Sequence, residues 1–236
     1  MIIKVMTYNI MHGLDYALLK QGERAVNLER ISEIILDNNP DIININEIYS
    51  KPMNNIDDEY FDHLKYLKDL VNYPYAYFSK AIENRHGSYG NAIISKYPLD
   101  DIKIFDVEDP KNVCSHQLEH RVITSFRYKS INIIGTHFGL VKGEQENALK
   151  LLKNIIKDDE QIIFMGDLNM TCDNEIIKDI SNILKDSINE GFTFPSINPE
   201  RKIDYIFYNN IKLKEAKIIE RVASDHFPVL AIFEVN

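Results

Sequence analysis

The chain of 236 residues is long enough for one large domain or two small ones, and its hydrophobic content of 44% is ordinary for a globular protein. Its formal net charge of -9 argues against a broad basic surface for tight, non-specific nucleic-acid binding. A charge sum hides any local basic rim, so nucleic acid remains open as a transient substrate. The first ten residues are too short and too polar for a signal peptide, and no apolar run reaches membrane-spanning length. We therefore expect a soluble, cytoplasmic protein.

The first half of the chain alternates strand-like apolar runs with helical periodicity. Strands are predicted at residues 2–9 and 41–48, with a helix over residues 27–39 between them. This order is typical of a right-handed crossover between parallel strands. Further along we predict a polar loop at 51–59, a helix at 60–72, strands at 76–81 and 91–96 around a turn at 87–90, a weaker strand at 102–107 and a polar loop at 109–116.

The second half continues in the same way. We predict a hairpin of strands 117–128 and 131–136, a helix at 143–157, a strand at 161–166, a helix at 173–184, an ordered loop at 186–201, and strands at 202–208, at 211–219 and from about 229. No repeat, low-complexity segment or linker divides the chain. The sequence therefore predicts a single α/β domain over residues 1–236, with a mixed sheet or two stacked sheets.

The segment Q-I-I-F-M-G-D-L-N at residues 161–169 is the most informative single stretch. Its apolar run favours a buried strand, and Gly166 permits a sharp turn or a close approach. Asp167 and Asn169 lie two residues apart and point the same way in an extended chain. A carboxylate and an amide in this position suit a hard cation or an oriented water, and equally a turn that caps the next helix.

Several other apolar runs also end in a polar residue. These residues are Asn9, Glu47, His137, Asp167 with Asn169, and Asp225 with His226. Since strand ends gather at one edge of an α/β sheet, the set predicts one site. Its oxygen ligands favour Mg²⁺, with Mn²⁺ or Ca²⁺ as alternatives, over zinc. The histidines suit proton transfer or stabilisation of an anion.

Each of these residues also has a structural alternative. Asn9 and the Asp225-His226 pair are both compatible with turns, and His137 with a hydrogen-bonded core histidine. Asp204 lies inside the apolar run I-D-Y-I-F, where a charged group needs a partner. That partner could belong to a structural salt bridge instead of a functional site. Because many strands show the same pattern, the site interpretation is favoured over a set of unrelated structural roles.

Seven motifs then appear in an order that resembles a known family. They are T-Y-N-I at residues 7–10, N-E-I at 46–48, Y-G-N-A-I-I-S-K-Y-P-L at 89–99, T-H-F-G at 136–139, G-D-L-N at 166–169, I-D-Y-I-F at 203–207 and S-D-H-F-P-V at 224–229. The set resembles the endonuclease/exonuclease/phosphatase superfamily, the group of DNase I, exonuclease III, sphingomyelinases and inositol polyphosphate 5-phosphatases. The resemblance runs from residue 3 to the end of the chain. Relatives often have Q-E-V where this chain has N-E-I, but the glutamate is kept.

The resemblance implies a four-layer α/β/β/α sandwich of two mostly antiparallel sheets, as in DNase I, with the site between their ends. It also implies residue roles. Asn9 and Glu47 would hold a divalent metal, supported by Asp225, which could also hold a second metal. His137 and Asn169 would contact the phosphate, and Asp204 would orient His226. Asp167 and His226 both remain candidates for the general base.

The implied activity is that of a metal-dependent phosphoesterase that hydrolyses phosphodiesters by in-line attack of an activated water. Nucleic acid, a phospholipid head group and a small phosphodiester are all open as substrates. The alternatives are a phosphomonoesterase of the same fold and a catalytically silent phosphate-binding module. Arg121 is a candidate for clamping phosphate, against a plain surface charge, and Asn91 a candidate for lining the cleft. We expect a monomer.

Overall fold

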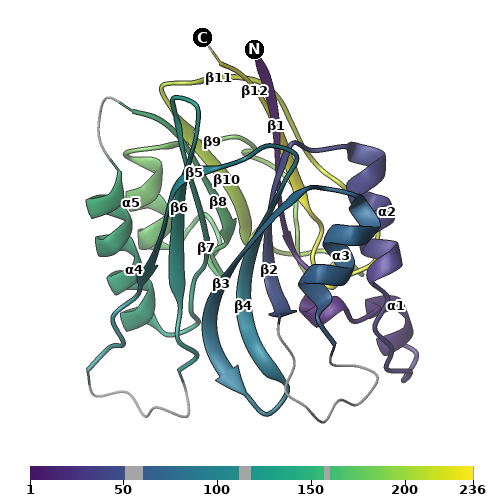
Figure 1. Cartoon of the computed structure of the whole chain (residues 1–236). Coiled ribbons are helices and arrows are strands. Elements are labelled where there is room, and N and C mark those ends of the chain that lie inside the picture. Colours follow the sequence, from purple (N-terminus) through teal and green to yellow (C-terminus); the bar gives the residue numbers. More distant parts are fainter. Residues whose placement is uncertain (51–60, 112–117, 157–159, 236) are drawn as a thin grey trace.

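The computed structural model describes residues 1–50, 61–111, 118–156 and 160–235 (Figure 1). The loop predicted at 51–59 and most of the loop predicted at 109–116 lie outside these residues. Two six-stranded sheets stack face to face, and helices cover their outer faces. The two chain ends lie side by side, because Ile2 pairs with Glu234. The predicted four-layer sandwich of mostly antiparallel sheets is confirmed.

The first sheet has the order β11-β12-β1-β2-β4-β3. Its strands are β1 (Ile2–Asn9), β2 (Ile42–Ser50), β3 (Tyr75–Asn84), β4 (Gly87–Ser95), β11 (Lys212–Ile218) and β12 (Val229–Glu234). β1 and β2 are parallel, and every other neighbouring pair is antiparallel. The predicted crossover between parallel strands 2–9 and 41–48 is therefore present.

The second sheet has the order β5-β6-β7-β8-β10-β9. Its strands are β5 (Asp100–Asp106), β6 (Val122–Tyr128), β7 (Ile131–His137), β8 (Gln161–Asp167), β9 (Lys185–Asp186) and β10 (Asp204–Asn209). It also contains one parallel pair, β7 with β8, at its centre. The two sheets thus resemble each other, and each central parallel pair ends in residues that the sequence predicted for the site.

The helices form the two outer layers. On one side lie α1 (Tyr16–Leu19), α2 (Leu28–Asn38) and α3 (His63–Val71), and on the other α4 (Lys142–Ile155) and α5 (Glu175–Ser181) (Figure 1). Local chemistry sets the ends of α2. The Asn27 side chain accepts a hydrogen bond from the Arg30 N–H at its start, and Asn39 takes the left-handed conformation just before Pro40 at its end. None of the helices in the described part of the chain is long and apolar enough to cross a bilayer.

Three apolar clusters hold the four layers together. One packs α2 and α3 on the first sheet, one fills the space between the sheets, and one packs α4 and α5 on the second sheet. Alternation along the strands divides the side chains among them. In β1, Ile3 and Val5 face the second sheet, whereas Met6 and Tyr8 face the helices. This division decides which residues reach the site.

The structure corrects two local predictions. Residues 87–90 lie inside β4, and the chain turns at Arg85 and His86 instead. The glycine is needed at Gly90 because a Cβ there would lie 2.2 Å from the carbonyl oxygen of Ser79, beside an irregularity in the β3–β4 pairing. The short 3₁₀ helix η1 (Met11–Gly13) and helix α1 follow β1, where we predicted only a turn.

Candidate active site

The polar residues at the strand ends lie on the same side of their strands as the apolar side chains that fill the space between the sheets. Asp167 follows Ile163 and Met165 of the inter-sheet cluster at intervals of two residues, and His137 follows Ile131 and Ile133 through Gly135 in the same way. Asn9 and Asp204 extend the inner faces of β1 and β10. The site is therefore the polar end of the core between the two sheets.

Glu47 reaches the site by a different route. By alternation it would follow Ile43 and Ile45, which face the helices. The β2–β4 register shifts between Ile45 and Ile48, and Glu47 adopts a φ of 60°. A bulge re-aims a side chain, and here it turns the carboxylate toward the other strand ends. A non-glycine residue in this conformation is strained, which is typical of functional positions.

Gly166 permits the close approach that the sequence predicted. It pairs with Thr136 across the parallel β7–β8 ladder, and a Cβ at Gly166 would lie 2.1 Å from the Thr136 carbonyl oxygen. Any larger residue would push the two strands apart immediately before His137 and Asp167. The glycine therefore keeps these two side chains adjacent.

A cavity of about 440 Å³ opens at these strand ends. Seven of the predicted residues line it: Glu47, Arg121, His137, Asp167, Asn169, Asp225 and His226. Asn9 and Asp204 do not line it but hydrogen-bond to residues that do. Asn91, predicted to line the cleft, lies behind it, because its carboxamide oxygen accepts a hydrogen bond from buried Asn46.

Asp167 lies at the centre of the cluster and is almost fully buried. One carboxylate oxygen accepts a hydrogen bond from the Asn9 amide at 2.9 Å, and the other from the Asn169 backbone N–H at 2.9 Å. His137 Nε2 lies 3.4 Å and His226 Nε2 3.7 Å from Asp167 Oδ2. Burial raises the pKa of Asp167 to about 7, so this carboxyl group exchanges a proton near neutral pH.

His226 is held from behind by Asp204. The Nδ1 atom lies 2.8 Å from Asp204 Oδ2, and both side chains are buried. Burial alone would lower the pKa of His226, but the nearby charges of Asp204 and Asp167 raise it to about 10. The imidazole is therefore a cation at neutral pH, with Nε2–H directed toward Asp167 and the cavity.

His137 has the opposite electrostatic character. Burial and the charge of Arg121 lower its pKa well below the usual value, so it is neutral. Arg121 Nη1 lies 3.0 Å from His137 Nδ1, and arginine can only donate. Nδ1 must then accept, which leaves the hydrogen on Nε2, the ring nitrogen that lies 3.4 Å from Asp167 Oδ2. Arg121 is itself held by Glu119 at 2.7 Å.

The donor set of the cavity fits a hard divalent cation. Glu47 and Asp225 both face it, and burial together with the charge of Glu47 raises the pKa of Asp225 despite the nearby His226. Carboxylates that repel one another in this way favour a bound cation in addition to the nearby imidazolium. Asn9 turns its amide nitrogen toward Glu47 Oε1 at 3.0 Å, and its oxygen accepts from the Met11 N–H.

A second grouping of metal-ligand atoms is also close together. Ligand atoms of Asp167, Asp204 and His226 lie within 4.8 Å of one another. The imidazolium of His226 stands between the two carboxylates and already supplies a positive charge there. We therefore place a cation more readily at Glu47 and Asp225 than at this trio.

Sequence reasoning missed several residues of the site. His12, Glu119, Phe194 and Arg201 line the cavity, and none lies at the end of a predicted strand. His12 Nε2 lies 3.6 Å from Glu47 Oε2, on a backbone with a φ of 57°. A histidine three residues after Asn9, next to a glycine, was the available signal.

Asn46 was missed because it lies behind the cavity. Its side chain belongs to the first sheet but bonds to the second: Nδ2 donates to the Thr136 carbonyl at 2.8 Å, and Oδ1 accepts from the Asp167 N–H at 3.1 Å. Nδ2 also donates to Asn91 at 2.9 Å. This buried amide therefore ties together the two sheets at the residues that carry the site.

Replacing Asn46 by leucine is expected to lower the free energy of unfolding by about 3 kcal/mol, because several buried groups lose their partners. We also expect kcat per folded molecule to fall about tenfold, since the backbone of Asp167 is no longer held. Denaturant unfolding and activity assays would measure both effects. Asn132→Leu is a matched control, because Asn132 is a buried amide at the opposite end of β7. If both variants lost stability but neither lost kcat, Asn46 would have no positioning role.

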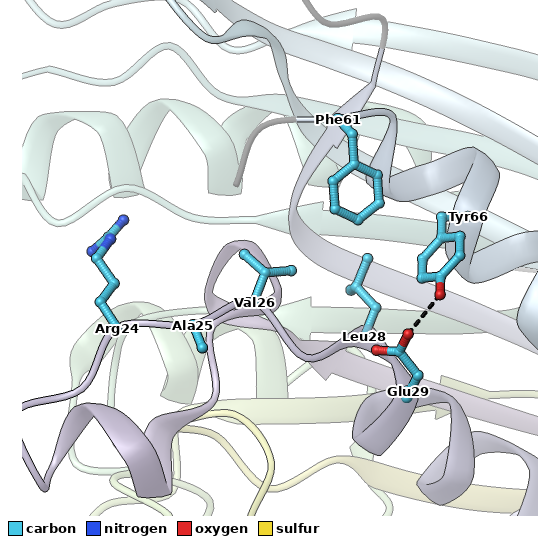
Figure 2. Close-up of a pocket in the computed structure, with 7 residues that line it drawn as sticks. All are labelled: Arg24, Ala25, Val26, Leu28, Glu29, Phe61 and Tyr66. Atoms are coloured by element: carbon cyan, nitrogen blue, oxygen red, sulfur yellow. Dashed lines mark hydrogen bonds between the residues drawn. The ribbon is translucent and has the colours of Figure 1, made fainter. Parts of the chain in front are cut away.

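A second cavity, of about 510 Å³, lies between the segment that leads into α2 and the start of α3 (Figure 2). Its walls include Val26, Leu28 and Phe61, and its carboxylate, Glu29, accepts a hydrogen bond from the Tyr66 hydroxyl. None of its lining residues borders the first cavity. The described part of this pocket offers no grouping for acid–base or metal chemistry.

Known proteins resemble this chain in sequence or in fold. The protein is 24% identical over 250 aligned positions to the uncharacterized protein YbhP of Escherichia coli K12, covering 97% of this chain and 94% of YbhP. An endonuclease/exonuclease/phosphatase from Beutenbergia cavernae superimposes with a TM-score of 0.85 at 18% identity, over 100% of this chain and 72% of the other. A mannosyl-6-phosphatase from Bacteroides thetaiotaomicron superimposes with a TM-score of 0.75 at 16% identity, over 99% and 100%.

The family assignment rests on a sequence model. The model of the endonuclease/exonuclease/phosphatase family matches residues 6–226, which include every residue predicted for the site. Its members hydrolyse phosphoesters. The two solved structures are too distant in sequence to indicate more than the shared fold. By the family match, this chain belongs to the endonuclease/exonuclease/phosphatase family.

Proposed function

We propose that the protein is a divalent-metal-dependent phosphodiesterase. The observation that carries the proposal is the setting of Asp167, a carboxyl group that lines an open cavity between a neutral and a cationic histidine. Burial raises the pKa of this carboxyl group to about 7. A general base is most effective when its pKa lies near the working pH. Two imidazole N–H groups beside it suit a reaction that builds negative charge on phosphate oxygens.

In the proposed reaction, Asp167 takes a proton from the attacking water. The pKa values favour Asp167 over His226 as the base, because His226 already carries a proton at neutral pH. His137 donates its Nε2–H to a non-bridging phosphate oxygen, and the Asn169 side chain, whose amide donates to the Phe138 carbonyl at 2.9 Å, lies beside it. His226, held by Asp204, stabilises the developing charge and can protonate the leaving oxygen.

Glu47 and Asp225 would hold the cation, for which Mg²⁺ is our first candidate, and Asn9 would fix the Glu47 carboxylate through its amide. A bound divalent cation would withdraw charge from the phosphate and lower the barrier to attack by an anionic nucleophile. The protein residues supply the remaining work of orienting the water, binding the phosphate oxygens and moving the protons.

A chromogenic phosphodiester and a matching phosphomonoester, assayed with Mg²⁺ and with EDTA, test the proposal directly. We expect diester cleavage only with the metal, and none by Asp167→Ala. Cleavage confined to the monoester would transfer the proposal to a phosphatase, a candidate supported by the fold shared with the mannosyl-6-phosphatase. Failure to cleave either substrate under any metal would favour a phosphate-binding module.

Mg²⁺ binding has its own thermal test, independent of turnover. At about 100 times its Kd, Mg²⁺ should stabilise the native protein by about 2.7 kcal/mol. For a chain of this size the melting temperature should rise by about 5–10 °C. Glu47→Gln should lose most of that rise, whereas Glu146→Gln, an exposed substitution on α4, should keep it. Equal stabilisation of both variants would remove Glu47 from the metal site.

A further inference from the structure

Arg201 forms the outer end of a stack that begins at the proposed catalytic centre. The centroids of the Phe194 and His226 rings lie 4.7 Å apart. The central carbon of the Arg201 guanidinium lies 4.8 Å from the centroid of the same Phe194 ring. All three residues line the same cavity. The distance from the Arg201 guanidinium to the centre of the His226 ring therefore cannot exceed the sum of these two distances.

The two arginines of the cavity differ in how their charges are used. Arg121 is buried, and its guanidinium is held by Glu119 and His137. Arg201 is exposed, and its guanidinium has neither a hydrogen bond nor an ion pair to any residue that the structure describes. It lies beside a cavity that carries Glu47, Asp167 and Asp225, and yet it neutralises none of them. Its positive charge is available to a ligand.

The segment that presents Arg201 is firmly held. Phe194 and Arg201 form an antiparallel bridge, with hydrogen bonds from the Arg201 N–H to the Phe194 carbonyl and from the Phe194 N–H to the Arg201 carbonyl, both at 2.9 Å. Buried Thr193 accepts hydrogen bonds at its hydroxyl from the N–H groups of Ile203 and Asp204. Stacking on an aromatic face also leaves the edge of a guanidinium free to bind an anion. The backbone segment that carries Arg201 therefore loses little conformational entropy when a ligand binds.

We propose that Arg201 binds a second phosphate of the substrate, next to the phosphate that is hydrolysed. The inference rests on the proposed function, because the catalytic centre defines where the first phosphate lies. Guanidinium groups bind phosphate through two parallel N–H bonds, and this one stands within reach of a neighbouring phosphate. Substrates with adjacent phosphates, such as phosphorylated nucleotides, would be preferred over isolated diesters.

Two matched nucleotides test this subsite. Thymidine 3′-(p-nitrophenyl phosphate) and its 5′-phosphorylated form release the same chromophore and differ only in the second phosphate. We expect wild-type kcat/KM to be about tenfold higher for the 5′-phosphorylated compound, as for one charge-assisted contact. Arg201→Gln should reduce this ratio to near one. Arg127→Gln, at the end of β6 that lies away from the cavity, should keep the wild-type ratio. Arg201→Lys should give a ratio between those of the wild type and Arg201→Gln.

A binding measurement separates this inference from the proposed function. With Mg²⁺ present, thymidine 3′,5′-bisphosphate should bind about tenfold more tightly than thymidine 3′-phosphate, and Arg201→Gln should remove the difference. If neither chromogenic compound is hydrolysed, the proposed function fails, while this comparison still decides the subsite. A wild-type ratio of one in both experiments, or an unchanged ratio in Arg201→Gln, would overturn the inference.

Discussion

Replacing Asp167 by asparagine is expected to lower kcat by about 10³–10⁵-fold, which is the scale of losing a central catalytic group. Asparagine preserves the shape of the side chain but cannot accept the proton of the attacking water. The wild-type enzyme should lose activity as the pH falls below about 7, because the carboxyl group becomes protonated there. The residual activity of the variant should no longer show that acidic limb. Initial rates from pH 5 to 9, at saturating Mg²⁺, would measure both effects.

The matched control for this prediction is Asp173→Asn. Asp173 is an exposed aspartate six residues further along the chain, hydrogen-bonded to the Thr171 hydroxyl, and it does not line the catalytic cavity. Its replacement should leave both kcat and the acidic limb unchanged. If Asp167→Asn retained kcat within about tenfold of wild type, Asp167 would not be the base, and another group in the cavity would have to take the proton.

The ends of the strands explain why so much of the site could be predicted. Polar residues that end apolar runs gather at one edge of an α/β sheet, and this rule placed Asp167, His137 and Asn9 together. The structure puts the Asn9 amide 2.9 Å from Asp167. Alternation supplies the physical reason that the structure reveals, because the next residue in an inward-facing row also faces the other sheet.

The features that could not be predicted depend on breaks in that regularity. Glu47 itself was predicted for the site, but the register shift in β2 that turns it inward was not, because no periodicity in the sequence shows a bulge. Glycines at 87–90 indicated a turn, yet Gly90 serves a close approach between paired strands. Arg201 lies in a segment without strand periodicity, and its position depends on tertiary contacts with Phe194. Asn46 was passed over because a buried amide behind a site has no sequence signature of its own.

Replacing Asp204 by asparagine is expected to lower kcat by about 10²–10⁴-fold and to change how activity depends on pH. Burial by itself lowers the pKa of His226, and the Asp204 and Asp167 charges outweigh it, raising the pKa to about 10. The catalytic form is the cation, so wild-type activity should persist above neutral pH and fall only as the pH passes about 10. Without the Asp204 charge, the alkaline limb should move down by about 1–3 pH units. Rates from pH 6 to 11 would locate it.

The surface pair of Asp106 and His120 provides the control for this second experiment. His120 Nε2 lies 2.9 Å from Asp106 Oδ1, so Asp106→Asn also removes a carboxylate from a histidine, but outside the catalytic cavity. Its pH profile should match the wild type. An alkaline limb that stayed near pH 10 in Asp204→Asn would assign that limb to a group other than His226. A direct titration of the His226 ring by NMR would then distinguish the two explanations, because the ring pKa must fall in Asp204→Asn if the carboxylate is what keeps the imidazole charged.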